Sequence, residues 1–240
     1  MKLFTSLSLF LGVLSLSYGQ IDNPAPSNDA SSDLPGTKFG ISVHGGLAYR
    51  TGTALYKVDE FNKDFARKLD VGYTVQIIPT YYFSKSFGVG IMANAFQTKV
   101  TSDIKLDQSS TIYKGSTEKD MILFVGPAFT GRYSYYKYFW GFTVSGGYTK
   151  YISELSVSNS TTSVTAKADG MNWSAGTNFE FGYTVFDNLR VSLTGNYFYG
   201  RVFKFKVTDN FGNSDDITLK GEDAEDVSRV GLGLGLNYSF

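Results

Sequence analysis

The sequence contains no cysteine and a single histidine, His44, so disulfides and thiolate metal sites are excluded. Charged residues make up only 18% of the chain, whereas an average soluble domain has about 25%. The 22 basic and 22 acidic residues give a net charge of zero, which offers no electrostatic basis for binding nucleic acid. We therefore expect no nucleic-acid partner and a surface that is not entirely in water.

Long apolar runs are also missing. Beyond the N-terminus, no run approaches the roughly 18 apolar residues that a membrane-spanning helix needs. The N-terminus, MKLFTSLSLFLGVLSLSYGQ, combines an early lysine, a short apolar stretch, and small residues Ser17 and Gly19 at the positions that a signal peptidase reads. We expect residues 1–19 to be a signal peptide cleaved after Gly19. Residues 20–36, rich in Pro, Ser, Asn and Asp, are expected to form a flexible periplasmic leader.

A period of two residues dominates the rest of the chain, which is typical of strands with one apolar face. Eight such segments occur, from KFGISVHGGLAYR to RVGLGLGLNYSF. The short connections SKS, SYYK and FDN alternate with four long polar ones, which places all short turns at one end, together with both termini. Residues 37–240 are therefore predicted to be all-β, an eight-stranded antiparallel up-and-down transmembrane β-barrel with extended extracellular hairpin loops.

The two faces of these strands differ in chemistry. One is apolar and aromatic, and the other carries mostly Gly, Ser, Thr and Asn. A soluble barrel would instead expose many Lys and Glu on its polar face. Small polar residues suit the crowded interior of an eight-stranded barrel, so we predict that the apolar face contacts lipid. Aromatic residues gather near both strand ends, as in membrane girdles. Pro79 and Pro127 fall on the apolar face and predict a bulge or locally weak pairing, since neither can donate to the ladder.

The signal peptide, the eight alternating strands and the terminal GLGLGLNYSF make the sequence resemble the small bacterial outer-membrane β-barrel family, of the OmpX and OmpA transmembrane-domain type. The resemblance covers residues 37–240. It implies export to the bacterial outer membrane, where lipid and lipopolysaccharide are partners, and it is nearly silent about activity. It also implies that the barrel-assembly machinery reads alternating residues of the last strand, namely Leu232, Leu234, Leu236, Tyr238 and Phe240.

Ionisable residues on the predicted inward face form a candidate lumen network: Glu180, Arg132, Arg190, Arg229 and His44. A charge in a narrow lumen is costly unless it is paired or hydrated. The network is either a static plug or, alternatively, a gated ion path in which Glu180 exchanges arginine partners, which would make the protein a small low-conductance channel. Inward apolar side chains favour the plug: Ile78, Phe96, Ile122, Phe124, Phe139 and Phe198.

Catalysis is not expected. Some barrels of this size are lipid-modifying enzymes or proteases, and their chemistry resembles a histidine paired with a serine or carboxylate near the outer rim. Here the one histidine, His44, lies at mid-strand, where a buried hydrogen-bonded role fits better, and no nucleophile motif accompanies it. We expect no cofactor and no metal. The acidic run GEDAED, residues 221–226, could hold cations that bridge lipopolysaccharide phosphates, but a charged loop that keeps the sheet soluble is the better interpretation.

The long connections continue the alternation and predict hairpins that turn at Ser109–Ser110, at Asn159–Ser160 and at residues 210–213. Such a protruding sheet has an edge that can pair with a partner strand. A short lid helix is expected in the first long loop, where spacing is helical at Val58, Phe61, Phe65 and Leu69.

Taken together, these features predict a monomeric, non-enzymatic outer-membrane barrel. Its role would be structural, or surface adhesion and binding through the long extracellular loops, with a surface protein ligand as partner.

Overall fold

The computed structural model describes residues 39–52, 67–105, 112–158 and 163–240. The chain divides into two units, Met1–Ala30 and Ser31–Phe240, and all described residues belong to the second. The predicted signal peptide and leader lie outside the described residues and stay predictions.

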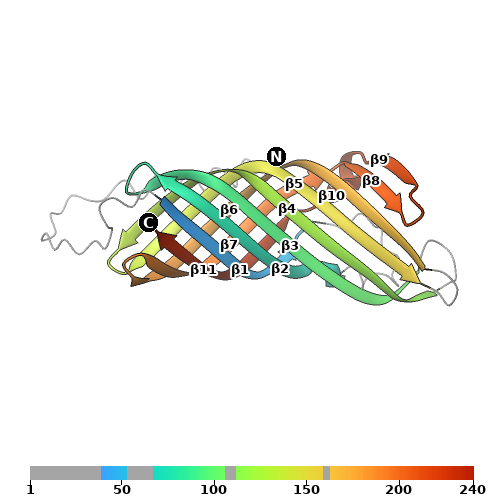
Figure 1. The fold of residues 1–240 in the computed structure, drawn as a ribbon, viewed down its shortest axis with the longest axis horizontal. Coiled ribbons are helices and arrows are strands. Elements are labelled where there is room, and N and C mark those ends of the chain that lie inside the picture. Colours follow the sequence, from blue (N-terminus) through green and yellow to red (C-terminus); the bar gives the residue numbers. More distant parts are fainter. Residues whose placement is uncertain (1–38, 53–66, 106–111, 159–162) are drawn as a thin grey trace, which may run out of the picture. The chain divides into compact units, whose positions relative to one another are not determined.

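Strands that pair in an antiparallel ring form the wall of the barrel. Of the eleven strands in the described part of the chain, eight close this ring, because β11 pairs with both β1 and β7. The strands are β1 (Phe39–Arg50), β2 (Val71–Tyr82), β3 (Phe87–Lys105), β4 (Ile112–Tyr135), β5 (Tyr138–Ser158), β6 (Ser163–Phe186), β7 (Leu189–Val202), β8 (Lys204–Asp209), β9 (Ser214–Thr218), β10 (Glu225–Asp226) and β11 (Arg229–Ser239), with one 3-10 turn, η2 (Gly221–Asp223). The predicted eight-stranded up-and-down barrel is confirmed (Figure 1).

The strands are staggered round the ring. Following paired residues from Gly40 through every strand returns to β1 at Arg50, ten residues further along. The intermediate partners are Thr80, Gly90, Ala128, Ser145, Gly176, Phe198 and Arg229. Such a stagger requires the strands to tilt, and Figure 1 shows them running obliquely, with β8 and β9 at the end opposite the C-terminus.

The last strand carries the predicted alternation. The predicted residues point outward, with exposed fractions between 41% and 72%: Leu232, Leu234, Leu236 and Tyr238 of β11, and Phe240 directly after it. Its glycines face crowded surroundings. Gly233 pairs with Gly46 of β1, and a Cβ atom on either would collide with the backbone of the other strand. A Cβ at Gly235 would collide with the imidazole of His44 in the lumen. The role of this strand as an assembly signal stays a prediction.

Aromatic side chains cluster at both ends of the outer surface. Tyr148 and Trp173 contact each other at the long-loop end, with ring centroids 4.1 Å apart. Trp140 and Phe181 do so near the short turns, at 4.3 Å. At that same end, Phe240 donates its backbone N–H to the carbonyl of Phe39, so the first and last strands meet beside the short turns.

Both prolines interrupt pairing without shifting the register. Pro79 pairs with Ile41 of β1, but the β2–β3 ladder has no pair between Ile77 and Thr80. Pro127 pairs with Ile91 of β3, but the β4–β5 ladder has no pair between Val125 and Ala128. The predicted weak pairing is confirmed, and no bulge accompanies it.

Beyond the bilayer, four strands continue outward as a sheet. A transmembrane strand needs about 9–11 residues, whereas β4 and β6 have 24 each. The β3–β4 and β5–β6 ladders run on to Lys105–Ile112 and Ser158–Ser163. The predicted turns at residues 109–110 and 159–160 lie outside the described residues, but the predicted hairpin turning at residues 210–213 is confirmed as β8–β9.

Only the end of the predicted lid helix falls in the described part of the chain. Residues 67–69 are helical, and Leu69 is buried against Val100 and Val157. Val58, Phe61 and Phe65 lie outside the described residues. No helix in the described ranges is long and apolar enough to cross a membrane.

Apolar side chains fill the middle of the lumen. One cluster joins Ile78, Met92, Phe124, Ala128 and Phe198, all at most 6% exposed. The rings of Phe124 and Phe198 meet edge to face, with centroids 5.1 Å apart. A second cluster lies further toward the loops and includes Phe96, Ile122 and Val202. The six predicted inward apolar residues are therefore confirmed as buried, and all except Phe139 belong to these two clusters.

This packing predicts different costs for two phenylalanines of β4. Phe124→Ala should lower the free energy of unfolding by about 3 kcal/mol, because it opens a cavity among the lumen side chains. Phe129→Ala is the matched control: its ring faces lipid and is 38% exposed, so it should cost less. Urea unfolding in phospholipid vesicles measures both. Equal losses would contradict a packed lumen.

Candidate functional site in the lumen

The inward residues of β4 mark the order of layers along the lumen. From the short-turn end, Arg132 and Thr130 line a small cavity, Ala128 and Phe124 belong to the first apolar cluster, and Ile122 belongs to the second. Asp120 and Glu118 follow, both buried, among charged side chains at the loop end. Two polar regions are thus separated by an apolar core.

The cavity at the short-turn end contains three of the five predicted network residues. Glu180, Arg132 and Arg190 all line it, together with Tyr82. The guanidinium of Arg132 lies 3.7 Å above the Tyr82 ring, and its Nε donates to the Lys85 carbonyl. Arg190 lies 5.4 Å from the centroid of the Phe139 ring. The arginines therefore lie beside aromatic rings at the mouth of the barrel.

Glu180 and His44 form the buried centre of this region. His44 Nε2 lies 3.3 Å from Glu180 Oε2, and both side chains are nearly inaccessible. Glu180 also accepts hydrogen bonds from Asn178 and Ser192, and His44 Nδ1 is 3.2 Å from the Gln76 amide. The predicted buried, hydrogen-bonded histidine is thus observed: its Nδ1 meets the Gln76 amide, and its Nε2 faces the Glu180 carboxylate.

Arg229 lies apart from that group, against the apolar core. It is 1% exposed, donates to Asn94 Oδ1 at 2.7 Å and to the Val227 carbonyl at 3.2 Å, and lies 4.3 Å from the Phe198 ring centroid. The five predicted residues all lie at the lumen, but Arg229 is not part of the group round Glu180.

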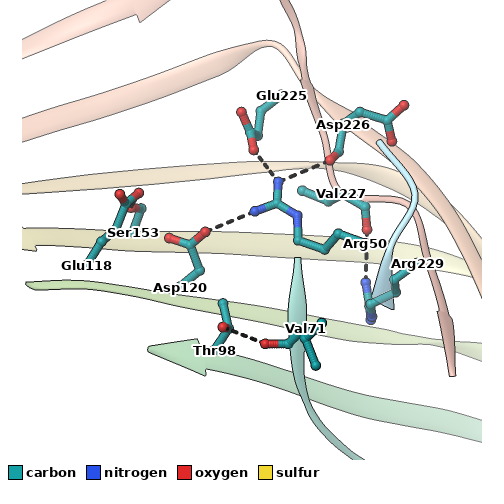
Figure 2. Close-up of polar contacts among 10 residues, drawn as sticks. All are labelled: Arg50, Val71, Thr98, Glu118, Asp120, Ser153, Glu225, Asp226, Val227 and Arg229. Atoms are coloured by element: carbon teal, nitrogen blue, oxygen red, sulfur yellow. Dashed lines mark hydrogen bonds and ion pairs between the residues drawn. The ribbon is translucent and has the colours of Figure 1, made fainter. Parts of the chain in front are cut away.

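A second charged group, at the loop end, centres on Arg50. Its Nη1 donates to Asp120 at 2.9 Å, and its Nη2 donates to Glu225 and, at 3.1 Å, to the Asp226 carbonyl. Arg50, Asp120 and Glu225 are each at most 3% exposed. Figure 2 shows the Arg50 guanidinium, which belongs to β1, between these partners, which come from β4 and β10. Arg50 thereby connects the segment before β11 to the barrel wall.

Glu118 lies next to this group and beyond the membrane. A span of about 9–11 residues from the short turn at residues 136–137 ends near residue 124, well before Glu118. Burial and the nearby charge of Asp120 raise the pKa of Glu118 to about 8. Ser153 Oγ donates to the Glu118 carboxyl at 3.3 Å. The outer cluster, Arg50, Asp120, Glu118 and Glu225, therefore holds a carboxyl whose proton is retained near neutral pH.

Sequence reasoning missed the outer cluster. Asp120 and Glu118 continue the inward face of β4 past Ile122, so a longer predicted strand would have included them. Glu225 carried no such signal, because it is 175 residues from Arg50. The interpretation of the acidic run at residues 221–226 as a charged, solvated loop was wrong for Glu225. This residue is buried and neutralises Arg50.

The side chains in the lumen hold the structure together and fill the barrel. The outer cluster holds a loop segment, the apolar core blocks the middle, and the Glu180–His44 pair lies on the other side of that core. Among the described residues, no group of three or more His, Cys, Asp or Glu side chains is placed to hold a metal ion.

Known proteins resemble this chain in structure but not in sequence. No protein-family model matches the chain, and no curated protein matches it. Solved structures do. A major outer membrane protein from Thermus thermophilus is 11% identical, with a TM-score of 0.51 over 84% of this chain and 99% of that one. OprG from Pseudomonas aeruginosa is 15% identical, with a TM-score of 0.49 over 84% and 97%. Neisserial surface protein A is 11% identical, with a TM-score of 0.44 over 84% and 97%.

At these sequence identities, structural similarity establishes the fold but not the function. Of the three structures, only the Thermus thermophilus protein has a TM-score above 0.5. The chain has the fold of small bacterial outer-membrane β-barrels. That fold, together with the apolar belt on the outside of the barrel, places the protein in the outer membrane.

Removing the central cation should destabilise the protein strongly. Arg50→Met removes the cation that pairs with the buried carboxylates of Asp120 and Glu225, and we expect a loss of about 3–5 kcal/mol. Arg201→Met is the control, because Arg201 is 44% exposed and 3.6 Å from Asp226, and an exposed pair contributes at most about 1 kcal/mol. Urea unfolding in vesicles compares the two; similar losses would mean that the outer cluster does not stabilise the fold.

The raised pKa of Glu118 predicts a pH dependence. The folded protein keeps this proton up to about pH 8, whereas an unfolded glutamate releases it near 4.5. The stability associated with this protonation is complete below about pH 4.5 and is lost as pH rises through about 8. Wild-type protein should therefore lose stability relative to Glu118→Gln between pH 5 and pH 9. A constant difference between the two unfolding free energies would show that the pKa is not raised.

Proposed function

We propose that this protein is a non-enzymatic surface-binding protein, in which a filled barrel holds a protruding sheet outside the cell. The observation that carries the proposal is the continuation of β3–β6 beyond the membrane and their extension by β8 and β9 into one sheet. Short turns lie on the periplasmic side in such barrels and long loops on the outside, so the sheet faces the exterior.

The join between the barrel and this sheet supports a rigid display. β6 pairs with β7 up to Ser174–Gly200 and then with β8 from Gly170–Phe205. Phe205 is 5% exposed and packs into the apolar cluster at the loop end, with its ring centroid 6.0 Å from that of Tyr151. A sheet fixed in this way loses little conformational entropy on binding.

The tip of the β8–β9 hairpin is also ordered by its own residues. Asp209 accepts hydrogen bonds from the backbone N–H groups of Phe211 and Asn213 and from the Asn213 amide, and the Asn213 amide in particular lowers the pKa of Asp209. Gly212, at φ 87°, supplies the left-handed conformation that this turn needs. Phe211 is left 71% exposed at the tip. A rigid turn that displays an aromatic ring suits protein recognition.

The β9 edge of the sheet favours recognition through side chains over strand addition. In the described part of the chain, β9 pairs with β8 alone, and its five residues are all exposed. Asp215 and Asp216 lie on this strand, and charges on an edge strand disfavour pairing with other chains. A surface protein ligand would therefore contact the hairpin and the outer face of the sheet.

The filled lumen favours this proposal over the alternative of a small channel. Ion passage would need water through the layer of Ile78, Met92, Phe124 and Phe198, each at most 2% exposed. A lipid-modifying or proteolytic function has less support, because His44 lies on the far side of this core from the outer rim.

The test uses cells that display the full protein and cells that display a variant with residues 204–218 replaced by a short Gly-Ser turn. Both are applied to an array of immobilised proteins and glycans. Binding by the wild type that the variant loses is the expected result. The control is Phe211→Ser, which keeps the hairpin and removes only the exposed ring, so it separates a contact from a fold defect. Equal binding by cells with and without the protein would contradict a binding role.

Planar-bilayer recording tests the alternative on the same protein. We expect no steady conductance. A steady conductance that Glu180→Ala alters would overturn the filled-lumen argument and favour the channel.

A further inference from the structure

Basic side chains line the outward face of the sheet just beyond the outer aromatic girdle. The alternation of β3–β6 and of β8 places these lysines on that face: Lys99, Lys119, Lys150, Lys167, Lys204 and Lys206. Two of them have acidic partners, since Lys150 Nζ is 3.0 Å from Asp169 and Lys167 Nζ is 3.9 Å from Glu154. The excess positive charge lies elsewhere in the band.

Lys99 and Lys119 form part of that excess. They are direct cross-strand partners on β3 and β4, and like charges placed opposite each other destabilise a sheet. Neither makes an ion pair with any residue that the structure describes. Lys119 has Glu154 opposite it on β5, and this carboxylate is shared with Lys167. The row Lys99–Lys119–Glu154–Lys167 thus holds three cations and one anion.

Hydroxyl groups extend this row on the same face. One position further out, Thr101 Oγ1 and Thr117 Oγ1 lie 3.0 Å apart, again as direct partners on β3 and β4. Two lysines and two threonines therefore occupy adjacent rows of one patch on the outer surface. Asp103, the next outward acid on β3, already accepts the Gly115 backbone N–H at 2.9 Å.

The height of this patch relates it to the membrane. Tyr73, which is 74% exposed, pairs with Gln97, and Gln97 pairs with Met121, so these three form one outward row at the girdle. Lys99 and Lys119 occupy the next outward row. A span of about 9–11 residues from Phe87, at the short-turn end of β3, ends near residue 97. The lysine pair therefore lies at the level of lipid headgroups.

We propose that Lys99 and Lys119, with Thr101 and Thr117, bind a phosphate group of the phosphorylated glycolipid in the outer leaflet. A phosphate between the two ammonium groups would relieve their repulsion and accept charge-assisted hydrogen bonds from both. The threonine hydroxyl whose proton is not used in the Thr101–Thr117 hydrogen bond would donate to a remaining oxygen. The acyl chains of the same lipid would lie along the apolar belt below the Tyr73–Gln97–Met121 row. Lipid would thus be held at one defined point of the barrel circumference.

The experiment uses the full mature chain refolded in detergent. It is titrated with lipid A that carries two phosphates and, separately, with the same lipid after its phosphates are removed. Bound lipid is counted by native mass spectrometry. The variant is K99Q/K119Q, and the matched control is K204Q/K206Q, which removes the same charge from the same sheet but leaves the proposed site intact. Circular dichroism shows whether each variant is folded.

We expect the wild type to bind the phosphorylated lipid about tenfold more tightly than the dephosphorylated one, as one or two charge-assisted hydrogen bonds would give. K99Q/K119Q should lose this preference, and K204Q/K206Q should keep it. No preference in the wild type, or an equal loss in the control, would overturn the site. Binding of a soluble sulfated polysaccharide at these lysines without any phosphate preference for lipid A would show instead that the patch serves a soluble glycan. None of these outcomes depends on the hairpin-deletion test.

Discussion

The pairing of β1 with β11 closes the sheet, and the rest of the structure depends on that closure. In hydrocarbon, an open edge would leave backbone N–H and C=O groups without partners, at several kcal/mol each. The eleven paired positions from Gly40–Ser239 to Arg50–Arg229 remove that cost. They also require the two strands to approach closely, which Gly46 and Gly233 permit because neither has a Cβ atom.

Closure with eight strands makes a narrow lumen, and the lumen must then be filled. The chain fills it in layers, with polar pairs at the ends and aromatic and aliphatic side chains between them. Arg50 completes the filling at the loop end, because its guanidinium neutralises Asp120 and Glu225 and connects β10 to the wall. The filled barrel is a rigid base for β3–β6. These four strands continue into the exterior as an open sheet, beyond the point where the other strands of the ring end.

Much of this architecture could be read from local patterns. A period of two residues fixes which side chains share a face, so the outward position of Leu232 and the inward position of Phe124 followed from the sequence. The interrupted pairing at Pro79 and Pro127 followed as well, because a missing N–H is a local property. The outer cluster did not follow: Arg50 and Asp120 are 70 residues apart, and Arg50 and Glu225 are 175 apart. The grouping of Glu180 with His44, and the separation of both from Arg229, likewise depended on register.

The sequence by itself determined the strand pattern, the face that meets lipid and hence the class of membrane protein, because each of these depends on neighbours along one strand. Only the tertiary structure decided which charges meet in the lumen and that the lysines of β3 and β4 lie opposite each other. Those neighbours are set by the stagger of the strands round the ring. Following the paired residues round the ring from Gly40 leads to Arg50, and this ten-residue offset is a property of the closed barrel rather than of any single strand.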